Sequence, residues 1–179
     1  MKYFFLILLL AGTKAQAQTF YIVRHAEKEL ADTNARSMQA DPPLSVAGKQ
    51  RAQDLKTWMQ GKGLTQVYST NYERTRATVQ PSAAAAGVTI QLYSPRPDST
   101  NALINQLHQL DAKAVVLIAG HSNTIDDLAN KLTGRTVVPG DLPETEYDNL
   151  YVIRKEGEGY SFTALKYGEP ANFKKILKQ

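Results

Sequence analysis

Short apolar runs alternate with amphipathic segments along most of the chain. The runs are rich in β-branched and aromatic residues and are too short for helices, so they predict buried strands. These strands cover residues 19–23, 66–70, 88–93 and 114–119. Alternation of strands with helical segments is typical of an α/β fold, in which helices cover both faces of a mostly parallel sheet.

Apolar residues at helical spacing predict the helices of this fold. The predicted helices run from Ser45 to Gly61, from Glu73 to about Pro81, over 100–110, and from Thr124 or Ile125 to Leu132. Ser45 is of the type that caps a helix start, and Gly134 closes the last helix. We expect Pro81 to kink or stop the second helix, because proline lacks the backbone N–H that a helix interior needs.

The end of the chain follows a different pattern. Two alternating segments, 149–155 and 160–166, flank a Glu-Gly-Glu-Gly stretch and predict a hairpin that adds an antiparallel edge to the sheet. The polar stretch from Glu29 to Pro43 is too rich in Asp, Asn, Ser and Pro for a core element and predicts a loop.

Cationic and imidazole side chains follow three of the predicted strands. Arg24 and His25 end the first strand, Arg74 comes shortly after the second, and His121 follows the strand over 114–119. Open α/β sheets place their ligand sites at the carboxyl ends of strands. An arginine offers a planar fork for phosphate or carboxylate, and a histidine can serve as nucleophile, base or ligand.

These motifs, Arg24-His25-Ala26, Ser69 through Arg74-Thr75, and Gly120-His121, resemble the histidine phosphatase superfamily in order and spacing. The resemblance spans roughly residues 20–151 and is closest to small members with few insertions. It implies the three-layer α/β/α fold of the phosphoglycerate mutase-like group.

The resemblance also implies a chemistry. His25 would take the phosphoryl group as a covalent phosphohistidine, which water then hydrolyses, with no metal or other cofactor. Arg24, Arg74 and His121 would bind the phosphoryl group, since a phosphomonoester brings close to two negative charges. Asn123 either binds phosphate or caps the helix that follows it.

The sequence leaves the proton donor for the leaving group open. Ser122 follows His121 where the acid phosphatase branch of the family has an acidic residue. Asp98 lies in the region where other members place an Asp or Glu, and it is our candidate acid.

Four glutamates are rivals of Asp98: Glu27, Glu73, Glu144 and Glu146. Glu27 and Glu73 also have a structural interpretation, in which they hold the neighbouring arginines Arg24, Arg74 or Arg76 in place.

Residues 1–17 predict a signal peptide, and residues 18–179 a single domain. Lys2 precedes an apolar run over 3–11, and Ala15-Gln16-Ala17 has the form of a signal peptidase site. The run is well short of the roughly 20 residues that cross a bilayer. We therefore expect an exported protein, periplasmic or secreted, with no stable membrane insertion after cleavage.

The composition gives no support for a disulfide-stabilised fold or for a nucleic-acid-binding protein. The chain has no cysteine, so its core must suffice without disulfides in an oxidising compartment. The formal charge of +4 includes Lys2 and Lys14, and a domain near +2 does not predict binding to nucleic acid. Expected partners are a phosphorylated small molecule, an envelope component or a phosphoprotein.

Three other functions compete with the phosphatase interpretation. The three histidines, at 25, 108 and 121, form no local ligand pair, which argues against a metal hydrolase. A binding protein for a phosphate ligand remains an alternative, although the intact His25 favours catalysis. A mutase of the same family is the other alternative, and predicted export away from cytoplasmic substrates favours a phosphatase.

Overall fold

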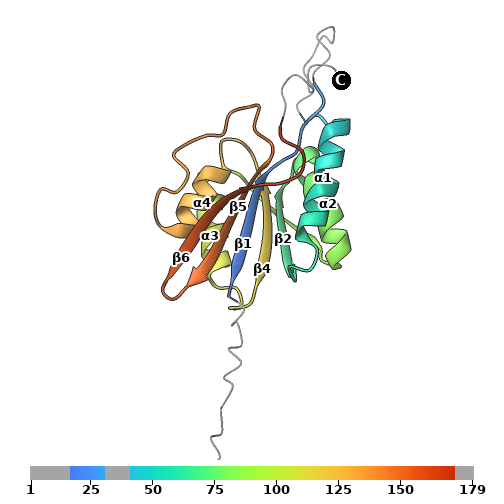
Figure 1. Ribbon diagram of the computed structural model, residues 1–179. Coiled ribbons are helices and arrows are strands. Elements are labelled where there is room, and N and C mark those ends of the chain that lie inside the picture. Colours follow the sequence, from blue (N-terminus) through green and yellow to red (C-terminus); the bar gives the residue numbers. More distant parts are fainter. Residues whose placement is uncertain (1–16, 31–40, 172–179) are drawn as a thin grey trace, which may run out of the picture.

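The computed structural model describes residues 17–30 and 41–171 (Figure 1). The predicted signal peptide and most of the predicted polar loop lie outside the described residues. Within them the chain forms six strands and four helices. None of these described helices is both long and apolar enough to cross a membrane.

The six strands form one mixed sheet in the order β3-β2-β4-β1-β5-β6. The strands are β1 (Thr19–Arg24), β2 (Gln66–Thr70), β3 (Ile90–Tyr93), β4 (Val115–Gly120), β5 (Asn149–Glu156) and β6 (Gly159–Lys166). β1 to β4 run parallel, and β5 pairs antiparallel with both β1 and β6. The predicted α/β class and antiparallel edge hairpin are confirmed.

Four helices cover the two faces of the sheet (Figure 1). They are α1 (Val46–Met59), α2 (Glu73–Ala86), α3 (Pro97–His108) and α4 (Ile125–Thr133). Alternate residues of β1 face the two helix layers. Phe20 and Ile22 pack in the core with α3 and α4, whereas Tyr21 and Val23 pack with α1 and α2. The predicted three-layer arrangement is therefore confirmed.

Two helix boundaries differ from the sequence prediction. Of the two effects expected of Pro81, a kink or a stop, the stop does not occur: α2 continues to Ala86, because Ser82 and Ala83 are buried and the alanine run has high helix propensity. Gly87 then closes α2 in the left-handed conformation, with φ of 68°. α3 starts at Pro97 rather than Thr100, and proline suits a first helical turn.

The start of α1 lies directly on the segment that follows β1. Ser45 caps the helix by accepting from the Gly48 N–H at 3.1 Å, and the Ser45 N–H donates to the Glu27 carbonyl at 3.0 Å. A Cβ at position 48 would overlap that carbonyl oxygen of Glu27. Glycine at this position therefore permits the close approach of α1 to the Arg24–Glu27 segment.

Gly48→Ala should destabilise the fold by about 1–3 kcal/mol, because backbone on both sides must shift to admit the methyl group. Gly140→Ala is the matched control, since a Cβ there meets nothing within 4 Å. Urea unfolding of both variants measures the difference. Equal stability of the two would contradict the close packing of α1 on Glu27.

Candidate active site

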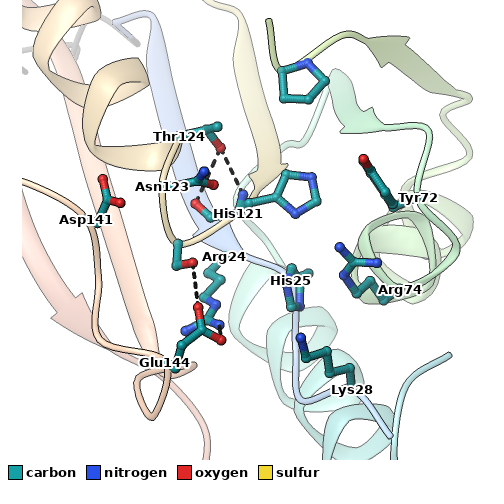
Figure 2. A pocket seen from close by; sticks show the side chains of 12 residues that line it. Arg24, His25, Lys28, Tyr72, Arg74, His121, Asn123, Thr124, Asp141 and Glu144 are labelled. Atoms are coloured by element: carbon teal, nitrogen blue, oxygen red, sulfur yellow. Dashed lines mark hydrogen bonds and ion pairs between the residues drawn. The ribbon is translucent and has the colours of Figure 1, made fainter. Parts of the chain in front are cut away.

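The carboxyl ends of β1, β2 and β4 meet at one edge of the sheet. Arg24 pairs in register with Gly120 across β1 and β4, and the His25 N–H donates to the Gly120 carbonyl at 2.8 Å. A cavity of about 530 Å³ opens at this edge. Five of the six predicted site residues line it: Arg24, His25, Arg74, His121 and Asn123 (Figure 2).

His25 is buried and held in one tautomer. Its Nδ1 lies 2.8 Å from the Ala26 carbonyl oxygen, which can only accept, so Nδ1 carries the proton and Nε2 keeps a lone pair. Burial lowers the pKa of His25 to about 3, and the positive charges of Arg24 and Arg74 lower it further. The hydrogen bond to the Ala26 carbonyl acts in the opposite direction and raises this pKa. At neutral pH the imidazole is neutral, as a nucleophile requires.

His121 lies beside His25, with ring centroids 5.4 Å apart and planes 65° from parallel. Its Nε2 is 3.0 Å from Oγ1 of Thr70, at the end of β2, which fixes the ring. Burial, and then the charges of Arg74 and Arg24, lower the pKa of His121 to about 4. His121 is thus neutral in the free site, and it adds a positive charge only if a bound anion raises this pKa.

The guanidinium of Arg24 is only 1% exposed. Its Nη1 donates to the carbonyl oxygens of Pro143 and Glu146 at 2.9 and 3.1 Å, and its Nη2 donates to Oε2 of Glu144 at 2.9 Å. The guanidinium carbon also lies 4.1 Å from the ring centre of Tyr147. Among the described residues, Nε has no hydrogen-bond partner.

Arg74, in the first turn of α2, is held in a similar way. Its Nη1 donates to Oδ1 of Asp41 at 2.8 Å, and Oδ2 of Asp41 accepts from the Glu73 N–H at 2.7 Å. The guanidinium lies over the ring of Tyr72, 4.5 Å from its centre. Its Nε is likewise buried and has no partner among the described residues.

The two arginines flank His25 in the cavity (Figure 2). A buried donor without a partner costs about 1–3 kcal/mol, so native proteins rarely keep one outside a functional site. Among the described residues six buried side-chain atoms lack a partner, and two of them are the Nε–H groups of arginines that line this cavity. The arrangement suits an oxyanion held between the arginines and next to Nε2 of His25.

Asp98, the candidate acid, does not line the cavity. It is exposed in the first turn of α3, and the earlier start of this helix places it on the surface. Of the four rival glutamates, Glu144 alone lines the cavity among the described residues. Glu146 accepts from Asn149 at 2.8 Å and lies 3.5 Å from Lys166.

The interpretation of Glu27 as a partner of Arg24, Arg74 or Arg76 is wrong. Glu27 is buried and pairs with Arg51 of α1, whose Nε and Nη2 lie 2.9 and 2.6 Å from its Oε1. Arg51 lies 24 positions from Glu27, inside α1, so proximity in sequence could not predict that the two residues pair. For Glu73, no side-chain ion pair forms within the described part of the chain.

Sequence reasoning missed the groups that hold the arginines. Asp41 comes from the predicted polar loop, and Tyr147 comes from the irregular segment before β5. Neither position has a periodic pattern that predicts where the side chain lies. Within the described residues, no three His, Asp or Glu side chains come together as a metal site.

Known proteins share the sequence signature of this chain. A family model described as histidine phosphatase superfamily (branch 1) matches residues 20–94. Probable phosphoglycerate mutase GpmB of Escherichia fergusonii is 32% identical over 92 residues, which make up 51% of this chain and 42% of that relative. The match therefore spans less than half of the relative's length.

Solved structures share the fold. The protein histidine phosphatase SixA, complexed with tungstate, gives a TM-score of 0.63 at 17% identity, over 83% of this chain and 96% of that chain. An Escherichia coli K-12 chain assigned as an α-ribazole-5′-phosphate phosphatase gives 0.65 at 14% identity, over 84% and 97%. The predicted resemblance is confirmed: residues 20–94 match the model of the histidine phosphatase superfamily, and the chain has the fold of these structural neighbours.

The two depressed histidine pKa values predict a loss of stability in acid. Histidine in an unfolded chain titrates near pH 6.5, whereas His25 and His121 titrate at about 3 and about 4 in the fold. Below pH 6.5 the unfolded state therefore binds more protons. Lowering the pH from 7 to 5 should cost about 2 kcal/mol for each of these histidines.

Urea unfolding at pH 7 and pH 5 measures this cost. His25→Gln and His121→Gln should each lose about 2 kcal/mol less than the unsubstituted chain over this interval. The control is His108→Gln, an exposed position at the end of α3, which should behave like the unsubstituted chain. Identical losses in all four proteins would show that neither site histidine is held neutral by burial.

Proposed function

We propose that this protein is a phosphatase that hydrolyses a phosphomonoester, or a phosphohistidine, through a covalent phosphohistidine on His25 and without a metal ion. One observation carries the proposal: a neutral histidine with a free Nε2 lies between the buried Arg24 and the partly buried Arg74, and the buried Nε–H groups of both arginines have no partner among the described residues. These groups match the needs of phosphoryl transfer, in which positioning and charge provide most of the catalysis.

In the first half of the reaction, Arg24 and Arg74 hold the phosphoryl oxygens, and Nε2 of His25 attacks phosphorus. The bond from phosphorus to the leaving oxygen breaks as the N–P bond forms. The Ala26 carbonyl accepts from Nδ1–H at 2.8 Å and steadies the positive charge that develops on the ring. Water then attacks phosphorus, the N–P bond breaks, and inorganic phosphate leaves neutral His25 behind.

Three observations support phosphate rather than another anion as the ligand. The family model covers the segment that contains Arg24, His25 and Arg74. One structural neighbour is a protein histidine phosphatase bound to tungstate, a tetrahedral oxyanion. Another is assigned as a phosphatase of a small phosphate ester. The substrate class proposed here accordingly includes small phosphorylated molecules, envelope components and phosphoproteins.

Mutase activity is the second candidate, because the relative from E. fergusonii carries that name. A mutase must keep its phosphoryl group from water and return it to the bound acid. A phosphatase only needs water to reach the phosphohistidine. The cavity at His25 is wide at about 530 Å³ and is lined largely by polar groups, which favours access of water.

Hydrolysis of para-nitrophenyl phosphate by the chain from Gln18 tests the proposal. The unsubstituted chain should release nitrophenol in the presence of EDTA, and His25→Ala should lose at least about 10³-fold in kcat/KM because no nucleophile remains. His108→Ala is the matched control, since this exposed histidine lies outside the site.

Two outcomes would contradict the proposal. Activity that persists in His25→Ala would remove the nucleophile, and activity abolished by EDTA would indicate a metal hydrolase. Turnover of phosphoglycerate to its isomer faster than to free phosphate would replace the phosphatase with the mutase.

We also propose that the protein is exported and cleaved after Ala17. The predicted signal peptide ends in Ala15-Gln16-Ala17, so the periplasm of a Gram-negative host should contain a chain whose intact mass corresponds to a start at Gln18. Ala17→Arg should block this cleavage, whereas Thr13→Arg, outside the cleavage motif, should leave the mass unchanged. Full-length chain confined to the cytoplasm would contradict export.

A further inference from the structure

A carboxylate of the cavity wall lies on one of the two phosphate-binding arginines. Oε2 of Glu144 accepts from Nη2 of Arg24 at 2.9 Å, and its Oε1 accepts from the Ser122 hydroxyl at 3.0 Å (Figure 2). Glu144 is the sole glutamate that lines the cavity among the described residues, and Asp141 is the only other carboxylate there.

Glu144 occupies Nη2 of Arg24, a donor that an incoming phosphate would also use. Nη1 is committed to two carbonyl oxygens, so Nε and Nη2 form the remaining edge. In the Glu27–Arg51 pair, the corresponding Nε and Nη2 atoms of Arg51 both donate to the carboxylate of Glu27. On Arg24 the Nε has no described partner while Nη2 holds Glu144. A phosphate that takes over the Nη2 contact therefore displaces Glu144.

Glu144 is the partner that can move. Its side chain is 70% exposed and lies in the irregular segment between α4 and β5, whereas Arg24 is 1% exposed and anchored by two carbonyl bonds. A phosphomonoester carries close to two negative charges and a carboxylate carries one, so the phosphate has the stronger attraction for Arg24. Substrate thus moves Glu144 off the arginine but leaves it at the wall of the same cavity.

On the basis of the phosphatase function proposed above, we propose that Glu144 is the catalytic acid, released from Arg24 by the incoming phosphate so that it can protonate the leaving oxygen. Partial burial raises the pKa of Glu144, but Arg24, Ser122 and Lys28 outweigh it and hold that pKa below its ordinary value in the free protein. Loss of the Arg24 contact and a phosphate neighbour both act to raise it. The displaced carboxylate then takes a proton from solvent.

The proton balance closes over both half-reactions. While Nε2 of His25 bonds to phosphorus and the ester P–O bond breaks, the Glu144 carboxyl gives its proton to the leaving oxygen, which departs as an alcohol. Glu144 is then a carboxylate and takes a proton from the water that attacks the phosphohistidine. The N–P bond breaks and phosphate leaves. Glu144 then releases its proton to solvent and returns to Arg24 as a carboxylate.

A series of aryl phosphates tests the assignment, because only poor leaving groups need the acid. Glu144→Gln should lose at least about 10²-fold in kcat/KM on phenyl phosphate but less than about tenfold on para-nitrophenyl phosphate. A plot of log kcat/KM against leaving-group pKa should become steeper in this variant. The control is Asp141→Asn, the other carboxylate of the cavity, whose plot should stay parallel to that of the unsubstituted chain.

Four results would overturn the assignment. Equal losses on both substrates would reduce Glu144 to a group that orients Arg24, and a uniform gain would reduce it to a competitor of phosphate. A steeper plot for Asp141→Asn alone would move the role to Asp141. If the unsubstituted chain hydrolyses none of these esters, the proposed phosphatase function fails and this inference fails with it. Thermal melting of each variant separates these effects from unfolding.

Discussion

Burial of the Arg24 guanidinium at the carboxyl end of β1 is the constraint on which the site depends. A buried charge needs compensating contacts, and here the chain supplies the carbonyl oxygens of Pro143 and Glu146 together with the Tyr147 ring. The irregular segment before β5 is therefore fixed over the site. The same charge helps to keep His25 and His121 neutral, which links the fold directly to the nucleophile.

A second buried pair holds the other side of the motif. Glu27 and Arg51 are both almost fully buried, and Arg51 also donates from Nη1 to the Tyr167 carbonyl at 3.1 Å. This pair joins the segment after β1, the helix α1 and the segment after β6. Removal of one partner of such a pair typically costs about 3–5 kcal/mol, since the other charge stays buried. The backbone on which His25 lies is thus held by α1 and by a segment more than 100 positions away in sequence.

Local patterns were enough to predict the layers and the positions of the four central site residues. Strand periodicity located β1, β2 and β4, and the rule that parallel strands end at one edge brought Arg24, His25 and His121 together. Local patterns did not predict the helix boundaries that depend on tertiary packing. The burial of Ser82 and Ala83 carried α2 past Pro81, and the start of α3 at Pro97 moved Asp98 to the surface. Asp41 and Glu144 lie in irregular segments, whose paths no periodicity specifies.

The covalent intermediate on His25 is the central claim of this account, and direct detection tests it best. The chain from Gln18 can be mixed with excess para-nitrophenyl phosphate, quenched within milliseconds in alkali, digested and analysed by mass spectrometry. The account predicts one added phosphoryl group on the peptide that contains His25. A phosphoryl group on the peptide that contains His121, or substrate turnover with neither peptide modified at any quench time, would contradict it.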